Sequence, residues 1–441
     1  MQAKTRILAW GDYACATGFA KVMSEIMRNL EATGRYEIDV VGINYDGGPY
    51  DRDRFPGNVW PALSGIRNGG VYGDVFGRQV LLDRIASKPY DVIFALQDTF
   101  IVQQFMKQLL DQIAGNPSKP KLVYYFPIDA EPKHDWIEDV VAKIDFPVTY
   151  TNYAKQECLK FKPELKDKIK VIYHGTNTAD FYPIDNIAQK KAFREQYFNF
   201  KADGKFLITN VNRNQSRKDI ARNFAILREL KDRGHDNVML YMHMAHNDVG
   251  GNLLVMADNW DLKFGTDFMF PAPNAFSPDK GLSVDIINMI YNVSNCVLST
   301  TLGEGWGLSI TEGMATRTPV IAPDNTSVAE ILAEHRGLLI PCGGKSLWIT
   351  KESDNERVRP LADVEKAADL IEGLINGVGP DVNAAYAWAK QHSWASITEQ
   401  WIKVIEKAAS AAQEDREPKL NREQRRANRK LQNQRLSYAG V

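Results

Sequence analysis

Two acidic residues, Glu304 and Glu312, lie eight positions apart, the first just before a glycine-rich bend and the second in the helical pattern that follows. Glycine lets a ligand approach the backbone closely, and the first turn of a helix has amides without helical partners. Such amides bind phosphate, and carboxylates accept hydrogen bonds from hydroxyl groups. The stretch therefore suits a ligand with both groups, although a strand–turn–helix with two incidental acids has the same spacing. Its candidate residues are Glu304, Gly305, Trp306, Gly307, Leu308, Ser309 and Glu312.

Two cations, Arg213 and Lys218, lie five positions apart after an apolar run at 206–211. If that run is a strand, both side chains lie near its carboxyl end. Positive charge at that place stabilises the negative charge that develops on a departing diphosphate. A solvated basic turn has the same composition, and the pattern assigns no role to Arg217.

The first half of the chain adds three candidates. The loop 11–18 precedes a helical stretch but lacks the Gly-x-Gly-x-x-Gly spacing of dinucleotide sites, which argues against NAD, and Gly18 is its candidate contact residue. Asp129 follows an apolar run that is typical of a buried strand, so its carboxylate can contact a ligand at the strand end. His174 also follows a short strand and can face a cleft, although a lone histidine is more often structural.

These candidates lie between short apolar runs that alternate with helical stretches. Such alternation predicts a parallel sheet with helices on both faces. The pattern pauses in a polar stretch at 183–203 and then restarts, which predicts two such domains in tandem. Their strand ends would face one cleft, where open α/β sheets bind ligands. The expected strands are 6–10, 38–43, 92–96, 122–126 and 148–151, then 206–211, 238–243, 296–299, 319–322 and 338–340.

The composition, 44% hydrophobic and 25% charged, is typical of a globular protein, and no apolar run approaches the ~18 residues of a membrane span. The first ten residues are typical of a strand and not of a signal peptide. The four cysteines lie far apart and form no metal-type pair, which fits a reducing cytoplasm. We therefore expect a cytoplasmic protein with no transmembrane segment, no bound metal and no cofactor.

The stretch 301–322 resembles the donor signature of retaining glycosyltransferases of the family-4 type, which have the GT-B fold. Those enzymes carry Glu, seven residues and Glu in a glycine-rich loop, then a small-residue helix and a Pro-Val-Ile strand. This chain has Glu304, Glu312, Gly313-Met314-Ala315 and Pro319-Val320-Ile321 in those places. The resemblance implies two Rossmann-like, doubly wound α/β domains that face a central cleft, with a last helix that crosses back to the first domain.

The resemblance also implies an activity, which is transfer of a sugar from a nucleoside diphosphate sugar to an acceptor hydroxyl with retention of configuration. It implies that Arg213 and Lys218 bind the donor phosphates, that Glu304 orients the sugar and that Glu312 holds the ribose. Relatives often have a histidine where this chain has Asp129, so the polar partner of the sugar stays open. The first domain, which binds acceptors in the family, resembles its relatives loosely and does not name the acceptor.

We expect four parts: an acceptor domain at 1–190, a donor domain at 191–390, a crossover helix at 391–412 and a basic tail at 413–441. Within the tail, residues 419–435 contain seven basic residues and one acidic residue, so they carry +6 in a chain of net charge −1. An Arg-rich arm can bind nucleic acid or another anionic surface by counterion release, or it can be a solvated end.

Three alternatives remain open. A glycosyltransferase that modifies a nucleic-acid base would fit the basic tail. A phosphorylase or a sugar epimerase would share the fold. A protein that binds nucleotide sugars or nucleic acid without catalysis would share the site, although Glu304, Glu312, Arg213 and Lys218 together argue against it.

Overall fold

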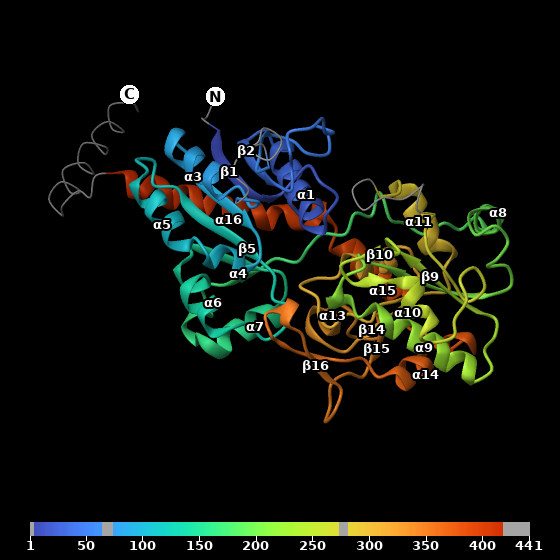
Figure 1. Ribbon diagram of the computed structural model, residues 1–441. Coiled ribbons are helices and arrows are strands. Elements are labelled where there is room, and N and C mark those ends of the chain that lie inside the picture. Colours follow the sequence, from blue (N-terminus) through green and yellow to red (C-terminus); the bar gives the residue numbers. More distant parts are fainter. Residues whose placement is uncertain (1–3, 64–73, 273–280, 418–441) are drawn as a thin grey trace.

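Two parallel sheets form the centres of two domains in the computed structural model, which describes residues 4–63, 74–272 and 281–417 (Figure 1). The first sheet has the strand order β3-β2-β1-β4-β5-β6-β7, and the second has the order β12-β9-β8-β13-β14-β15. Neighbouring strands run parallel, so their carboxyl ends meet at one edge of each sheet. The expected pair of doubly wound α/β domains is confirmed.

The first domain is built around β1, a strand that pairs with both β2 and β4 and is buried along most of its length. Helices cover both faces of such a sheet, which is why its central strands are almost continuously apolar. The elements are β1 (Thr5–Asp12), α1 (Gly18–Ala32), β2 (Tyr36–Ile43), β3 (Asn58–Pro61), α3 (Arg78–Ser87), β4 (Val92–Leu96), α4 (Thr99–Gln103), α5 (Met106–Gly115), β5 (Lys121–Phe126), α6 (His134–Asp139), β6 (Phe146–Thr149), α7 (Asn152–Phe161) and β7 (Lys170–Val171).

The second domain repeats the plan and adds two short antiparallel hairpins, β10–β11 and β16–β17. Their strands are only two or three residues long, too short to leave the alternation that marks a strand in a sequence. The elements are α8 (Ile187–Tyr197), β8 (Phe206–Val211), α9 (Ile220–Asp232), β9 (Val238–His243), β10 (Asn247–Asp248), β11 (Gly251–Asn252), α10 (Leu253–Asp258), β12 (Phe268–Met269), α11 (Val284–Val293), β13 (Cys296–Leu298), α12 (Leu308–Ala315), β14 (Val320–Pro323), α13 (Thr326–Ile331), β15 (Leu338–Ile340), β16 (Trp348–Thr350), β17 (Val358–Pro360), α14 (Val364–Ile375) and α15 (Val382–Gln391).

The stretch 100–113, whose apolar spacing predicts one helix, is divided into two helices, α4 and α5. The break falls at Phe105, whose ring turns into the core and contacts Trp10 edge to face at 5.2 Å. Burial of the Phe105 ring in the core thus interrupts what would otherwise be one continuous helix. The polar stretch between the domains contains α8, and none of the residues of this helix is buried.

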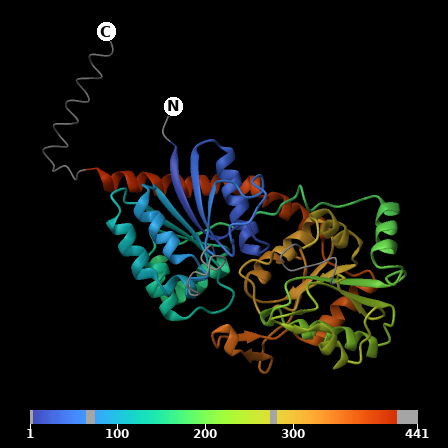
Figure 2. The ribbon, with the colours of Figure 1, turned by 45° about the horizontal axis from the view of Figure 1, so that its top comes forward.

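The last helix, α16 (Trp394–Arg416), returns to the first domain and lies along it (Figure 2). Its Trp401 is buried against Phe94 and Tyr125, with ring centroids 5.4 and 4.7 Å apart. Near its end Arg416 forms an ion pair with Asp91 at 2.7 Å. The crossover helix is thus confirmed, and it runs past the expected end at 412.

In the described part of the chain, no helix is long and apolar enough to cross a membrane. The four cysteines are free thiols. The basic tail expected at 413–441 lies outside the described residues from position 418 onward.

Candidate functional site

The glycine-rich bend lies at the carboxyl end of β13 and leads directly into α12. Gly307 is the N-cap of α12 with φ of 101°, a left-handed conformation that favours glycine. The amides of Leu308 and Ser309 therefore belong to the first turn of an eight-residue helix, where amides have no helical acceptor. The first turn of α12 thus begins at the residues that the sequence singled out as candidates.

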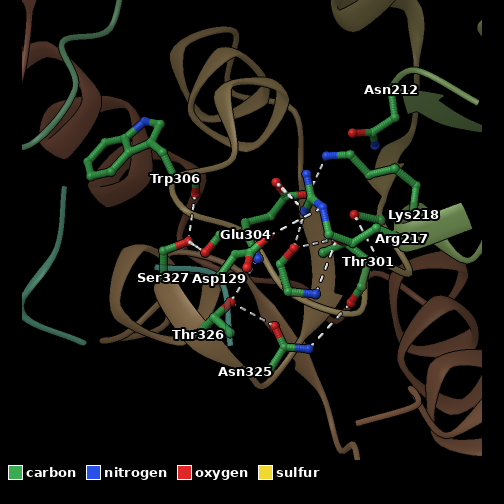
Figure 3. A network of polar contacts seen from close by, with 12 residues as sticks. Asp129, Asn212, Arg217, Lys218, Thr301, Glu304, Trp306, Asn325, Thr326 and Ser327 are labelled. Carbon is green, nitrogen blue, oxygen red and sulfur yellow. Dashed lines mark hydrogen bonds and ion pairs between the residues drawn. The ribbon is translucent and has the colours of Figure 1, made fainter. Parts of the chain in front are cut away.

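Glu304 is a nearly buried carboxylate held by two cations from the loop after β8 (Figure 3). Lys218 donates to Oε1, and the Nη1 atom of Arg217 lies 3.3 Å from Oε2. Burial alone raises the pKa of Glu304, but the two cations outweigh it, so the pKa lies below its usual value. The backbone of Glu304 is fixed as well, because its amide donates to Thr326 Oγ1 at 3.0 Å and its carbonyl accepts from Ser327 Oγ at 2.8 Å.

Of the two cations beside Glu304, the spacing selected Lys218 but not Arg217. Arg213 forms an ion pair with Asp248 of the β10–β11 hairpin at 2.8 Å, and its side chain is 55% exposed. The 3-10 turn at Ser216–Lys218 directs Arg217 and Lys218 toward Glu304 instead. No sequence signal singled out Arg217, because adjacent cations in a turn are typical of a solvated loop.

Asp129 follows β5 and is surrounded by three arginines of the second domain. Its carboxylate lies 2.9 Å from Arg357, 3.2 Å from Arg359 and 3.4 Å from Arg217. Burial raises the pKa of Asp129, but Arg359, Arg217 and Arg357 outweigh it and hold the pKa well below its usual range. In this arrangement both oxygens of the Asp129 carboxylate therefore contact arginines. The sequence missed both residues because Arg359 lies on the unexpected strand β17 and Arg357 directly precedes it.

The glycine loop of the first domain meets the donor-side loop of the second domain. A Cβ on Gly18 would lie 3.5 Å from the Leu308 side chain, so these two candidate residues are neighbours. One helical turn further, Lys21 binds Glu312 at 2.6 Å, and Tyr291 donates to the other oxygen of Glu312 at 2.9 Å. Gly18, Leu308 and Glu312 thus share one boundary between the domains.

His174 and Trp306 lie in an aromatic cluster beside this boundary. The imidazole is hydrogen-bonded to Tyr125 at 2.6 Å, and its ring centroid is 5.4 Å from that of Trp306. Burial lowers the pKa of His174 to about 3, so the ring is neutral at physiological pH. The Trp306 side chain points away from Arg217 and Lys218 (Figure 3). In this arrangement the His174 and Trp306 side chains thus pack against other aromatic rings at the boundary between the domains.

Sequence reasoning missed Asp12, the last residue of β1, and Asp98, which follows β4 as Asp129 follows β5. The three strands are adjacent and parallel, so these carboxylates lie along one edge of the first sheet. Burial, together with Asp129 and Asp12, raises the pKa of Asp98 to about 7 against the opposing effect of Arg217 and Arg357. Among residues 4–63, 74–272 and 281–417, no group of three or more His, Cys, Asp or Glu side chains is arranged to hold a metal.

Comparison with known proteins gives a fold but no family. No family model matches the chain, and no curated protein matches it. Solved structures do: HepE from Anabaena in complex with UDP and glucose covers 91% of this chain and 100% of its own, with a TM-score of 0.64 and 14% identity. A glycosyltransferase from Rickettsia africae (92% and 98%, TM-score 0.66, 15% identity) and sucrose-phosphate synthase from Thermosynechococcus elongatus (92% and 100%, 0.66, 15%) are similar. The chain has the GT-B fold.

Proposed function

We propose that the chain is a glycosyltransferase that moves a sugar from a nucleoside diphosphate sugar to an acceptor hydroxyl with retention of configuration. One observation carries the proposal: the carboxylate of Glu304 is held by Lys218 and Arg217 beside the glycine-capped N-terminus of α12. Cations and helix amides at one point suit a diphosphate, and a fixed carboxylate suits sugar hydroxyls. Similar folds in structures described with UDP and with UDP-glucose agree with this choice of donor.

In the proposed reaction, the bond between the anomeric carbon and the diphosphate oxygen breaks while the acceptor oxygen bonds to the same face. The acceptor proton passes to the departing diphosphate. Lys218, Arg217 and the amides of Leu308 and Ser309 stabilise the charge that develops on the diphosphate. Glu304 orients the sugar, and Glu312 exchanges its bonds with Lys21 and Tyr291 for ribose hydroxyls.

The acceptor binds on the first domain, where Asp12 and Asp98 present carboxylates to the cleft. Closure of the two domains excludes water from the reacting carbon. We further propose that transfer needs no metal ion and takes place in the cytoplasm. Unchanged turnover after treatment with EDTA tests the first of these statements, and localisation of the tagged protein tests the second.

Binding of the donor is the first test. Thermal unfolding is measured with UDP, UDP-glucose and the corresponding guanosine and adenosine compounds, because a ligand that binds the folded state raises Tm. Release of nucleoside diphosphate then reports transfer to water or to an added acceptor. Glu304→Gln should retain the fold and lose turnover by roughly 100-fold or more. A wild-type protein whose Tm responds to none of these compounds at millimolar concentration would refute the proposal.

A further inference from the structure

The hairpin β16–β17 reaches out of the second domain and touches the first. We call residues 348–360 the arginine hairpin, which follows β15 and precedes α14 (Figure 1, in orange). Arg359 is fully buried, and it donates to both the carbonyl and the carboxylate of Asp129. Arg357 binds the same carboxylate at 2.9 Å. Two guanidinium groups of one domain thus converge on one acid of the other.

A carboxylate within the hairpin, that of Asp354, orients the same two arginines that contact Asp129. Asp354 accepts from Arg359 at 2.5 and 2.8 Å and from Arg357 at 3.1 Å. Guanidinium groups oriented by a carboxylate of their own hairpin lose little freedom when they bind a second carboxylate.

Further contacts join the same two surfaces. The Arg357 guanidinium lies 5.3 Å from the centre of the Trp136 ring on α6, a cation–π geometry. At the exposed edge, Lys133 and Glu356 form an ion pair at 3.6 Å. These are four side-chain contacts between the hairpin and residues 129–136 of the first domain, and of them only the Lys133–Glu356 pair is strongly exposed.

Asp129 also connects the hairpin to the donor side of the cleft. Its second carboxylate oxygen lies 3.4 Å from Arg217, which binds the carboxylate of Glu304 and the carbonyl of Gly303. A Cβ on Gly303 would overlap the carbonyl of Asp129, so glycine is needed for the two loops to meet. Arg359, Asp129, Arg217 and Glu304 therefore form a continuous chain of charge contacts across the cleft.

We propose that the arginine hairpin latches the two domains in their closed arrangement, and that Arg359 is a positioning residue that acts through Asp129 to hold Arg217 against Glu304. The latch itself stands on the contacts above, whereas its effect on turnover rests on the proposed function. In an open arrangement Asp354 still holds both hairpin arginines, but Arg359 and Arg217 lose their common partner Asp129. The latch thus couples closure to the alignment of the donor-site cation.

A charge swap at the exposed edge tests the latch without touching the cleft. Lys133→Glu places two acids opposite each other, and adding Glu356→Lys restores an ion pair with reversed sign. Amide hydrogen exchange of segments 129–136 and 348–360 should become about two- to five-fold faster in Lys133→Glu and return toward wild type in the double variant. Lys143→Glu breaks a similarly exposed ion pair within the first domain and is the matched control. Equal exchange in the single and double variants would overturn the latch.

The buried part of the latch is tested at Arg359 and Asp129. Arg359→Gln should lower the turnover of UDP-glucose hydrolysis at least about tenfold while KM changes less, and Arg359→Lys should restore part of it. Arg233→Gln is the control, because Arg233 binds three acids of its own domain. If Arg359→Gln fails to fold, Asp129→Asn removes the same charge contact and is measured instead. We expect faster amide exchange in segments 129–136 and 348–360 of that variant. Wild-type exchange in Asp129→Asn would refute the proposal, and since exchange needs no substrate, this result is separate from any failure of the glycosyltransferase assignment.

Discussion

The ammonium group of Lys218 and the carboxylate of Glu304 form an ion pair whose two side chains are 12% and 8% exposed. Removal of one partner of such a pair leaves a buried charge without its partner and costs more than the pair itself contributes. Arg217 lies against the same carboxylate and lessens the loss.

This pair leads to the first prediction. Lys218→Met should lower the free energy of unfolding by up to about 3 kcal/mol, because Glu304 keeps its charge and loses its shortest partner. The double variant Lys218→Met/Glu304→Gln should be less destabilised than the sum of the single variants by at least about 1 kcal/mol. Urea unfolding measures all four proteins, and strict additivity would show that the pair is not coupled.

The second prediction concerns the two arginines of the loop after β8. Arg217→Ala should reduce turnover roughly 100-fold, because it removes a cation that contacts Glu304. Arg213→Ala should change turnover less than about threefold, since Arg213 forms an exposed pair with Asp248. Steady-state release of nucleoside diphosphate separates the two. The opposite ranking would restore the phosphate-binding role that the sequence spacing assigned to Arg213.

The third prediction follows from the raised pKa of Asp98. A carboxyl whose pKa is higher in the folded state, here about 7 against roughly 3.9 in the unfolded chain, opposes folding when it ionises. The protonated Asp98 carboxyl therefore makes its full contribution to the free energy of unfolding below pH 4, and this contribution is lost as the pH rises through 7. Asp98→Asn should therefore be more stable than wild type by at least about 1 kcal/mol at pH 8, and this gain should vanish near pH 4. Parallel stability curves for the two proteins between pH 4 and 8 would contradict the assignment.

The fourth prediction concerns the crossover helix. Trp401→Ala should destabilise the protein by about 3–5 kcal/mol, because the side chain is buried against Phe94 and Tyr125. Trp260→Ala is the control, since Trp260 is 39% exposed and should cost less than about 0.5 kcal/mol. Chemical unfolding followed by circular dichroism measures both, and similar losses in the two variants would show that α16 is only loosely attached.

The sequence predicts the features that depend on neighbours along the chain. The strands 92–96, 206–211, 238–243 and 338–340 are found with their expected bounds, because continuous apolar runs in a parallel sheet leave a clear signal. Leu308 begins α12 where expected, because glycines before a helical pattern mark its start. These are local properties, and the glycine-rich loop before α12 depends on them.

Contacts between residues that are far apart in the chain could not be predicted from the sequence. Asp129 and Arg359 are 230 positions apart, and no periodicity or motif links them. His174 shows the same limit, because whether a histidine faces a cleft or an aromatic cluster depends on which rings surround it. The fold is therefore predicted well, the glycine-rich loop before α12 in outline, and the charge contacts between the two domains hardly at all.

The return of α16 has a topological consequence. Because β1 and α16 both belong to the first domain, the chain enters and leaves the second domain through two crossings, and that domain is an insertion within the first. Both described ends of the chain lie on the same body (Figures 1 and 2). Among the described residues, the inserted domain is therefore joined to the first domain by two connections and has no free end of its own.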